Sequence, residues 1–312
     1  MYYPYFRGKQ FELIILRDKA EFIKDNKIHA IIEPVKNSFG QLTKAVKSLE
    51  EAKAEFTLIV NPKASSSSKF NTKEIMDEII CKECDRHCNI GVILQSATDV
   101  RLLSDLLKEY KDKNFTLIHF GYDNPGEVKT IIENKKNVKT NVFIEGFSGK
   151  LFRKHFIGTK RILIKDGFKK QSDGANYPEN EHFSELHATF RDEGMDGFGD
   201  YLIVGNDYSE TGGPALSVVI HLTYLNQDED MFIYHFKSHK TQKAIDTAGK
   251  FYEALEKMIQ TASKDSSKIF KSQAFNEYKK LYEDQHYPGL GYVKKLSMLH
   301  HIELIADYLK VK

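Results

Sequence analysis

Short apolar runs recur along the first two-thirds of the chain, and a longer amphipathic segment follows most of them. The runs are rich in Ile, Val, Leu and Phe and are continuous, which is typical of parallel strands buried on both faces. The segments between them carry apolar residues three or four positions apart and are predicted to be helices. The predicted strands are residues 2–6, 29–35, 56–61, 90–95, 115–121, 141–146, 161–166 and 200–205.

Repeated alternation of strand and helix predicts a parallel sheet covered by helices, and a count of eight closes into a (β/α)8 TIM-type barrel. Local signals agree, because Ser96 can cap a helix and Pro125 fits a first helical turn. An open doubly wound sheet is the main alternative. No Gly-x-Gly-x-x-Gly follows the first run, so the dinucleotide fingerprint of that alternative is absent.

The pattern changes after residue 205. A turn-rich stretch leads to β-like runs at 216–225 and 231–236, which predict an added antiparallel β-hairpin. Helical segments at 242–263, 269–284 and 291–309 predict a C-terminal helical extension. We therefore expect residues 1–240 to form the barrel with hairpin 216–236, and residues 241–312 to form helices packed on it.

Composition limits the class of protein and the cellular location that we expect. The 312 residues are 41% hydrophobic and 29% charged, which is typical of a globular fold. The formal net charge is +2, so the protein as a whole has no strong electrostatic attraction to nucleic acid or to anionic lipid. No apolar stretch reaches the roughly 18 residues of a membrane span, and the first residues lack a secretory signal pattern. Three cysteines within eight positions do not form a disulfide framework. We expect a cytoplasmic protein with no membrane association.

Polar residues end most of the predicted strands, and a barrel gathers those ends around one opening. Convergent carboxylates there would bind Mg²⁺ or Mn²⁺ or act as an acid and base, although a barrel rim is also polar where it only meets water. The expected catalytic residues are Glu33, Glu145 and Asp166, and the expected metal ligands are Glu33, Asp123, Glu145 and Asp166. The expected substrate-binding residues are Arg7, Lys9, Asn61, Lys63, His119 and Lys165.

A second candidate metal site lies outside that opening. Its residues, Cys81, Cys84, His87 and Cys88, supply thiol and imidazole ligands of the kind that zinc prefers. The cluster precedes the fourth predicted strand, so it belongs to the face opposite the expected opening. On a helix the three cysteines would share one side, and packing is the favoured interpretation.

Several segments together resemble the "beta protein" family of uncharacterised bacterial and phage proteins. They are residues 3–12, 31–34, 166–168, 199–205, 207–210 and 212–214, which include Tyr-Pro-Tyr-Phe-Arg-Gly-Lys, Ile-Ile-Glu-Pro and Gly-Asp-Tyr-Leu-Ile-Val-Gly. The resemblance implies a barrel. It also implies a nuclease-like protein partner encoded beside the chain, in a system that defends against phage. No catalytic residue carries over from the resemblance.

Three functional hypotheses follow. In the first, the barrel binds a phosphate-bearing ligand, a nucleotide or nucleic acid, and acts with the nuclease-like partner. In the second, it is a metal-dependent hydrolase of phosphate esters that uses the carboxylates at the opening. In the third, it is a non-catalytic scaffold.

Overall fold

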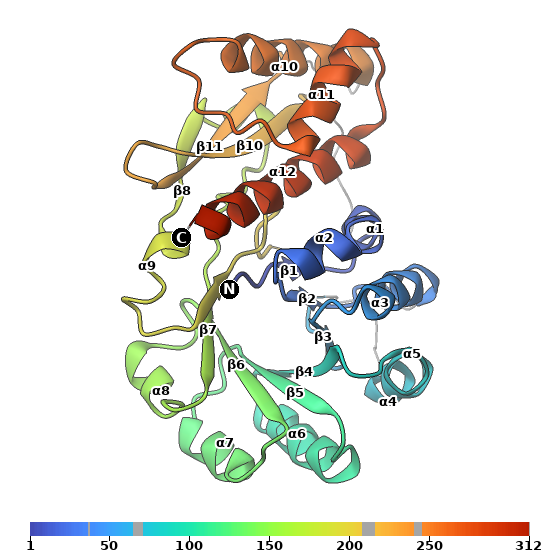
Figure 1. Ribbon diagram of the computed structural model, residues 1–312, viewed down its shortest axis with the longest axis vertical. Helices are drawn as coiled ribbons and strands as arrows, with labels where there is room; N and C mark the ends of the chain where they lie inside the picture. Colours follow the sequence, from blue (N-terminus) through green and yellow to red (C-terminus); the bar gives the residue numbers. More distant parts are fainter. Residues whose placement is uncertain (37, 65–70, 208–215, 240–244, 312) are drawn as a thin grey trace. The chain divides into compact units, whose positions relative to one another are not determined.

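The computed structural model describes residues 1–36, 38–64, 71–207, 216–239 and 245–311 (Figure 1). The chain divides into two compact units. The first contains Met1–Asp166 and Thr189–Asp200, and the second contains Gly167–Ala188 and Tyr201–Lys312. Within the described residues, no helix has both the length and the apolar character that a membrane crossing needs.

The first unit is a nearly closed barrel, which confirms the (β/α)8 prediction. Its described residues form an eight-stranded sheet in which neighbouring strands are parallel, in the order β1-β2-β3-β4-β5-β6-β7-β9. Hydrogen bonds from Tyr3 N to Phe198 O (2.8 Å) and from Tyr5 N to Asp200 O (2.9 Å) join the last strand to the first. The strands are β1 (Tyr5–Phe6), β2 (Ala30–Ile32), β3 (Phe56–Ile59), β4 (Cys88–Leu94), β5 (Asn114–His119), β6 (Val138–Ile144), β7 (Lys160–Ile164) and β9 (Gly197–Gly199).

Helices lie on the outer side of these strands (Figure 1). The capping signals predicted from sequence are present: Ser96 and Asp99 form a reciprocal capping box, and Asn124 caps the helix that Pro125 begins. The helices are α1 (Gln10–Asp18), α2 (Ala20–Asp25), α3 (Gly40–Ala52), α4 (Thr72–Ile75), the π-helical turn η1 (Met76–Ile80), α5 (Cys81–Glu83), α6 (Ala97–Glu109), α7 (Pro125–Ile132) and α8 (Lys150–Lys154). A further short helix, α9 (Leu186–Thr189), belongs mostly to the second unit.

The eighth barrel strand is not where the apolar pattern placed it. The predicted strand at 200–205 was wrong, because β9 ends at Gly199 and Leu202 has a positive φ of 54°. Glycines let β9 approach the first strand closely. A Cβ at Gly199 would lie 2.0 Å from the carbonyl oxygen of Tyr3, and one at Gly197 would lie 2.6 Å from that of Met1. Closure therefore depends on two small residues that carry no apolar signal.

The second unit contains the predicted hairpin, β10 (Val219–Leu225) and β11 (Met231–Lys237), which pair antiparallel as expected. A further strand that the sequence pattern missed, β8 (Asn180–Ser184), pairs with β11, and a 3₁₀ turn η2 (Gly174–Asn176) precedes it. The predicted C-terminal helices are present as α10 (Thr247–Ala262), α11 (Gln273–Glu283) and α12 (Leu290–Val311). Hydrogen bonds between α12 and Thr223 connect the hairpin to these helices. We expected the hairpin to be part of the barrel, but it lies in the same unit as the C-terminal helices.

The barrel interior has a polar layer and an apolar layer. Near the amino ends of the strands, Thr57 donates a hydrogen bond of 3.0 Å to Thr116 across β4. Gly91 of β4 makes this possible, because a Cβ there would lie 2.7 Å from Thr57 Cγ2. Two residues further along the same strand faces lie the buried side chains Ile59, Ile93, Ile118 and Val142. These apolar side chains separate the two ends of the barrel.

Candidate functional site

At the carboxyl ends of the strands, Glu33 forms a buried ion pair with Arg7. The Tyr5 hydroxyl donates to the same carboxylate oxygen (2.8 Å), and the backbone N–H groups of Lys63 (2.6 Å) and Ala64 (2.8 Å) donate to the other. Glu33 is only 1% exposed. Both of its oxygens are therefore satisfied within the protein, which suits a structural carboxylate better than a metal ligand or a general base.

A second ion pair lies at the same end. Lys63 Nζ is 2.6 Å from Asp99 Oδ1, and the Asn61 amide donates to the same oxygen at 3.1 Å. Burial alone would raise the pKa of Asp99, but hydrogen bonds from Lys63 and Ser96 outweigh it and lower the pKa. Asn61 and Lys63 were expected to bind substrate, and both hold a carboxylate of the protein. The Ser-x-x-Asp spacing before a helix could have revealed Asp99 in the sequence.

The predicted metal ligands are not brought together around one point. Asp123, Glu145 and Asp166 follow the neighbouring strands β5, β6 and β7 and are exposed, and Lys165 Nζ is 3.8 Å from Glu145 Oε1. Glu33 follows β2, which is four places from β6 in the strand order and therefore across the barrel. Among the described residues, no group of three or more His, Cys, Asp or Glu side chains has an arrangement that could hold a metal ion.

One predicted ligand-binding residue, His119, lies away from these ion pairs. His119 is buried on the outer face of β5, where its ring centroid is 4.8 Å from that of Phe143 and 4.5 Å from that of Phe156. Its Nε2 shares a hydrogen bond of 2.9 Å with Asn141, and burial lowers the pKa of His119 to about 4. Lys9 is the residue before α1. His119 thus fills the space between the sheet and α8 and does not face the opening.

The cysteine cluster does not form a metal site in the described part of the chain. Cys81 is exposed on α5, whereas Cys84 and Cys88 are buried. The expectation that all three share a helix face was wrong, because Cys88 is the first residue of β4. His87 Nδ1 lies 3.4 Å from Glu55 Oε1. The cluster is therefore explained by packing and a surface ion pair.

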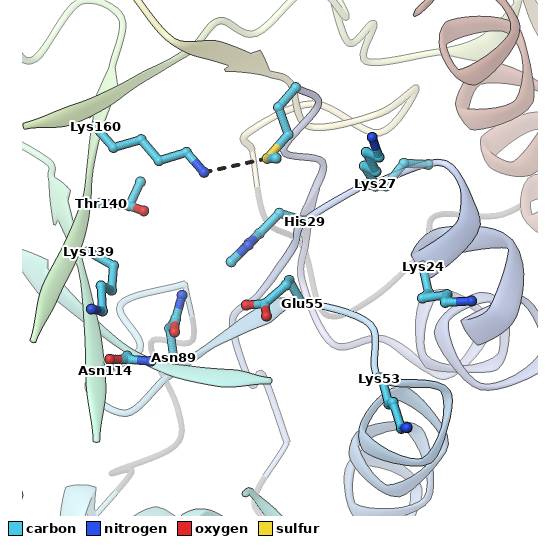
Figure 2. A pocket seen from close by; sticks show the side chains of 12 residues that line it. Lys24, Lys27, His29, Lys53, Glu55, Asn89, Asn114, Lys139, Thr140 and Lys160 are labelled. Carbon is cyan, nitrogen blue, oxygen red and sulfur yellow. Dashed lines mark hydrogen bonds between the residues drawn. The ribbon is translucent and has the colours of Figure 1, made fainter. Parts of the chain in front are cut away.

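A cavity of about 490 Å³ opens at the other end of the barrel, where the strands begin (Figure 2). Among the described residues that line it are five lysines and a single carboxylate. The lining residues are Met1, Lys24, Lys27, Ile28, His29, Lys53, Glu55, Asn89, Asn114, Lys139, Thr140 and Lys160. Most of them lie at the start of a barrel strand or within a few residues before it, so the barrel itself brings together residues far apart in sequence.

The charges around this cavity are unbalanced. Lys24 is paired with Asp25 (2.9 Å), and the carboxylate of Glu55 faces His87. The remaining lining lysines form no ion pair in the part of the chain that the structure describes. They are Lys27, Lys53, Lys139 and Lys160. Positive charge that is not balanced by nearby carboxylates, beside low-dielectric protein walls, attracts and concentrates anions.

Sequence reasoning missed these lysines because it considered only the ends of the strands. A signal was present: Lys53, Lys139 and Lys160 each lie at a strand start or a few residues before one. Since parallel strands also gather their starts at one face, lysines that recur there predict a basic patch.

No protein-family model matches the chain. A search of curated proteins also finds no match. The case for a function therefore comes from the geometry of the chain's own residues.

Proposed function

We propose that the protein binds a phosphate-bearing ligand in the lysine-lined cavity at the amino ends of the barrel strands. The observation that supports this most strongly is the excess of cations: Lys27, Lys53, Lys139 and Lys160 line one cavity with no ion-pair partner among the described residues. Lysine is a frequent phosphate ligand and acts as a point charge. A ligand with several negative charges suits such a cavity better than a single carboxylate would.

The position of the cavity favours binding over catalysis. In characterised barrels of this type the active site lies at the carboxyl ends of the strands, at the opposite face. There, Glu33 and Asp99 are held by Arg7 and Lys63. The hydrolase hypothesis needs carboxylates that are free to bind a metal or take up a proton, and the described geometry of Glu33 does not support that role.

The proposal is tested by titrating the protein with tripolyphosphate in a calorimeter. We expect binding that weakens as salt is added, because salt screens the lysine charges. Lys139→Gln and Lys160→Gln should each weaken binding about tenfold, since each removes a charge-assisted contact of about 1.5 kcal/mol. Lys129→Gln is the matched control, because Lys129 is an exposed lysine of α7 outside the cavity and its loss should leave the affinity unchanged. Equal affinities for all four proteins, or no binding by the wild type, would contradict the proposal.

A further inference from the structure

The floor of the cavity differs chemically from its rim. Lys24, Lys27 and Lys53 lie apart from the barrel interior, whereas uncharged polar groups lie at the interior, among them Asn89, Asn114 and Thr140, with Lys139 and Lys160 beside them (Figure 2). Resting on the function proposed above, we propose that the ligand is a mononucleotide, whose phosphates meet the lysines and whose nucleoside meets Asn89 and Asn114.

The two asparagines are placed to act together. Asn89 of β4 and Asn114 of β5 are register partners in adjacent parallel strands, so their side chains point to the same face of the sheet. Figure 2 shows the two amides beside each other at the cavity. Asn89 is only 4% exposed. Within the described residues, neither side chain forms a hydrogen bond with the protein.

An amide group that is largely removed from water and lacks a partner costs free energy. Each asparagine offers two N–H donors and a carbonyl acceptor, so the pair presents donors and acceptors side by side. The edge of a nucleobase carries the same kind of alternating donors and acceptors. A nucleobase would therefore satisfy Asn89 and Asn114 together, whereas inorganic phosphate would leave the carbonyl oxygens without a donor.

Figure 2 shows His29 near the asparagines, together with the charged side chains of Glu55 and Lys139. His29 shares a hydrogen bond of 2.7 Å with Thr57, and burial lowers the pKa of His29 to about 3, so it is neutral near pH 7. The Tyr3 ring stacks on His29 with centroids 4.7 Å apart and lies 5.5 Å from Lys160 Nζ. Its hydroxyl is buried and lies beside Thr140. Around His29 and Tyr3 the cavity therefore offers uncharged polar and aromatic groups, with Lys160 as the neighbouring cation.

The size of the cavity favours a mononucleotide over a strand of nucleic acid. Its volume of about 490 Å³ falls within the range of roughly 300–1,000 Å³ found for small-molecule sites. A nucleic acid strand would instead need a groove that continues beyond one nucleotide and tracks several phosphates. We therefore assign the cavity to one nucleotide with its phosphate chain.

Calorimetry with ATP, GTP, CTP and UTP, each compared with tripolyphosphate, tests this inference. At least one nucleotide should bind about tenfold more tightly than tripolyphosphate, which carries a similar charge but no nucleoside. Asn114→Ala should weaken nucleotide binding by about tenfold and leave tripolyphosphate binding unchanged. Asn114 is only partly buried, so its variant is less prone to unfold than one at Asn89. Asn276→Ala, at an exposed position of α11, is the matched control and should change neither affinity.

The outcomes separate this inference from the function on which it rests. If tripolyphosphate binds as tightly as every nucleotide, or if Asn114→Ala weakens both kinds of ligand equally, the nucleotide assignment is wrong and the phosphate site stands. If a single-stranded oligonucleotide binds more tightly than any mononucleotide, the assignment to one nucleotide is also wrong. If neither tripolyphosphate nor a nucleotide binds, the proposed function itself is overturned.

Discussion

Acidification from about pH 7 to about pH 5 is expected to unfold the protein, before most carboxylates begin to titrate. The cause is a set of buried histidines that are neutral in the folded state. Burial lowers the pKa of His119, His235 and His300 to about 4, that of His29 to about 3, and that of His221 well below its usual value. Each must stay uncharged as long as the protein is folded.

The direction of the effect follows from the order of the two pKa values. In the unfolded chain these histidines have a pKa of about 6.5, so above that pH neither state binds a proton and their protonation does not affect stability. Below it the unfolded chain takes up protons that the folded protein cannot, and stability falls as the pH falls toward the folded-state pKa. At about pH 5 each histidine costs roughly 2 kcal/mol, so the two in the first unit cost roughly 4 kcal/mol and the three in the second unit cost roughly 6 kcal/mol. Each cost is a large part of the whole stability of a typical domain, about 5–15 kcal/mol.

Circular dichroism as a function of pH measures this transition. His119→Phe should move the midpoint to lower pH, because a phenyl ring fits among Phe143, Phe152 and Phe156 and has no proton to gain. His286→Phe, at an exposed position, is the matched control and should leave the midpoint unchanged. A protein that remains folded below about pH 4 would contradict this account of the buried histidines.

Replacing Glu33 with Ala should lower the free energy of unfolding by about 3–5 kcal/mol, because it removes the buried carboxylate that pairs with the buried Arg7 charge. Glu145→Ala should change it by less than about 0.5 kcal/mol, since the Glu145 side chain is 48% exposed and lies 3.8 Å from Lys165. The two residues ended similar apolar runs in the sequence and ranked equally there. The structure assigns them very different energetic roles.

Urea denaturation of the two variants checks this contrast. The free energy of unfolding falls linearly with urea concentration, and extrapolation to zero urea gives its value in water. Equal slopes for the variants and the wild type would show that the comparison is valid. Similar, small decreases in the free energy of unfolding for both variants would mean that the Glu33 ion pair contributes little to stability. In that case Glu33 would again be a candidate for catalysis at the carboxyl ends of the strands.

Most of the barrel could be predicted because strands buried on both faces must be continuously apolar. The segments that became β2 to β7 carry this signal. The closing strand lacks it, because Gly197 and Gly199 are required where the backbone approaches Tyr3 closely. The Asn-Glu-His-Phe-Ser segment of β8 lies at a sheet edge and is too polar to be recognised from an apolar run.

The candidate site was predicted less well, for a physical reason. The rule that polar residues end barrel strands located Arg7, Glu33 and Lys63, but it did not show that they bind one another. That pairing depends on where the loop after β3 places the N–H groups of Lys63 and Ala64. Lysines at the starts of strands or just before them were overlooked because a lysine is usually solvated, and only the closed barrel brings them to one cavity.

The central claim is that phosphate binds where the barrel strands begin. Crystals of the protein grown with pyrophosphate test it most directly, because they show the position of the bound anion. The account predicts electron density for pyrophosphate in contact with Lys139 and Lys160 at the amino ends of β6 and β7. Density at the carboxyl ends, beside Lys63 or Lys165, or a lysine-lined cavity that contains only water, would contradict it.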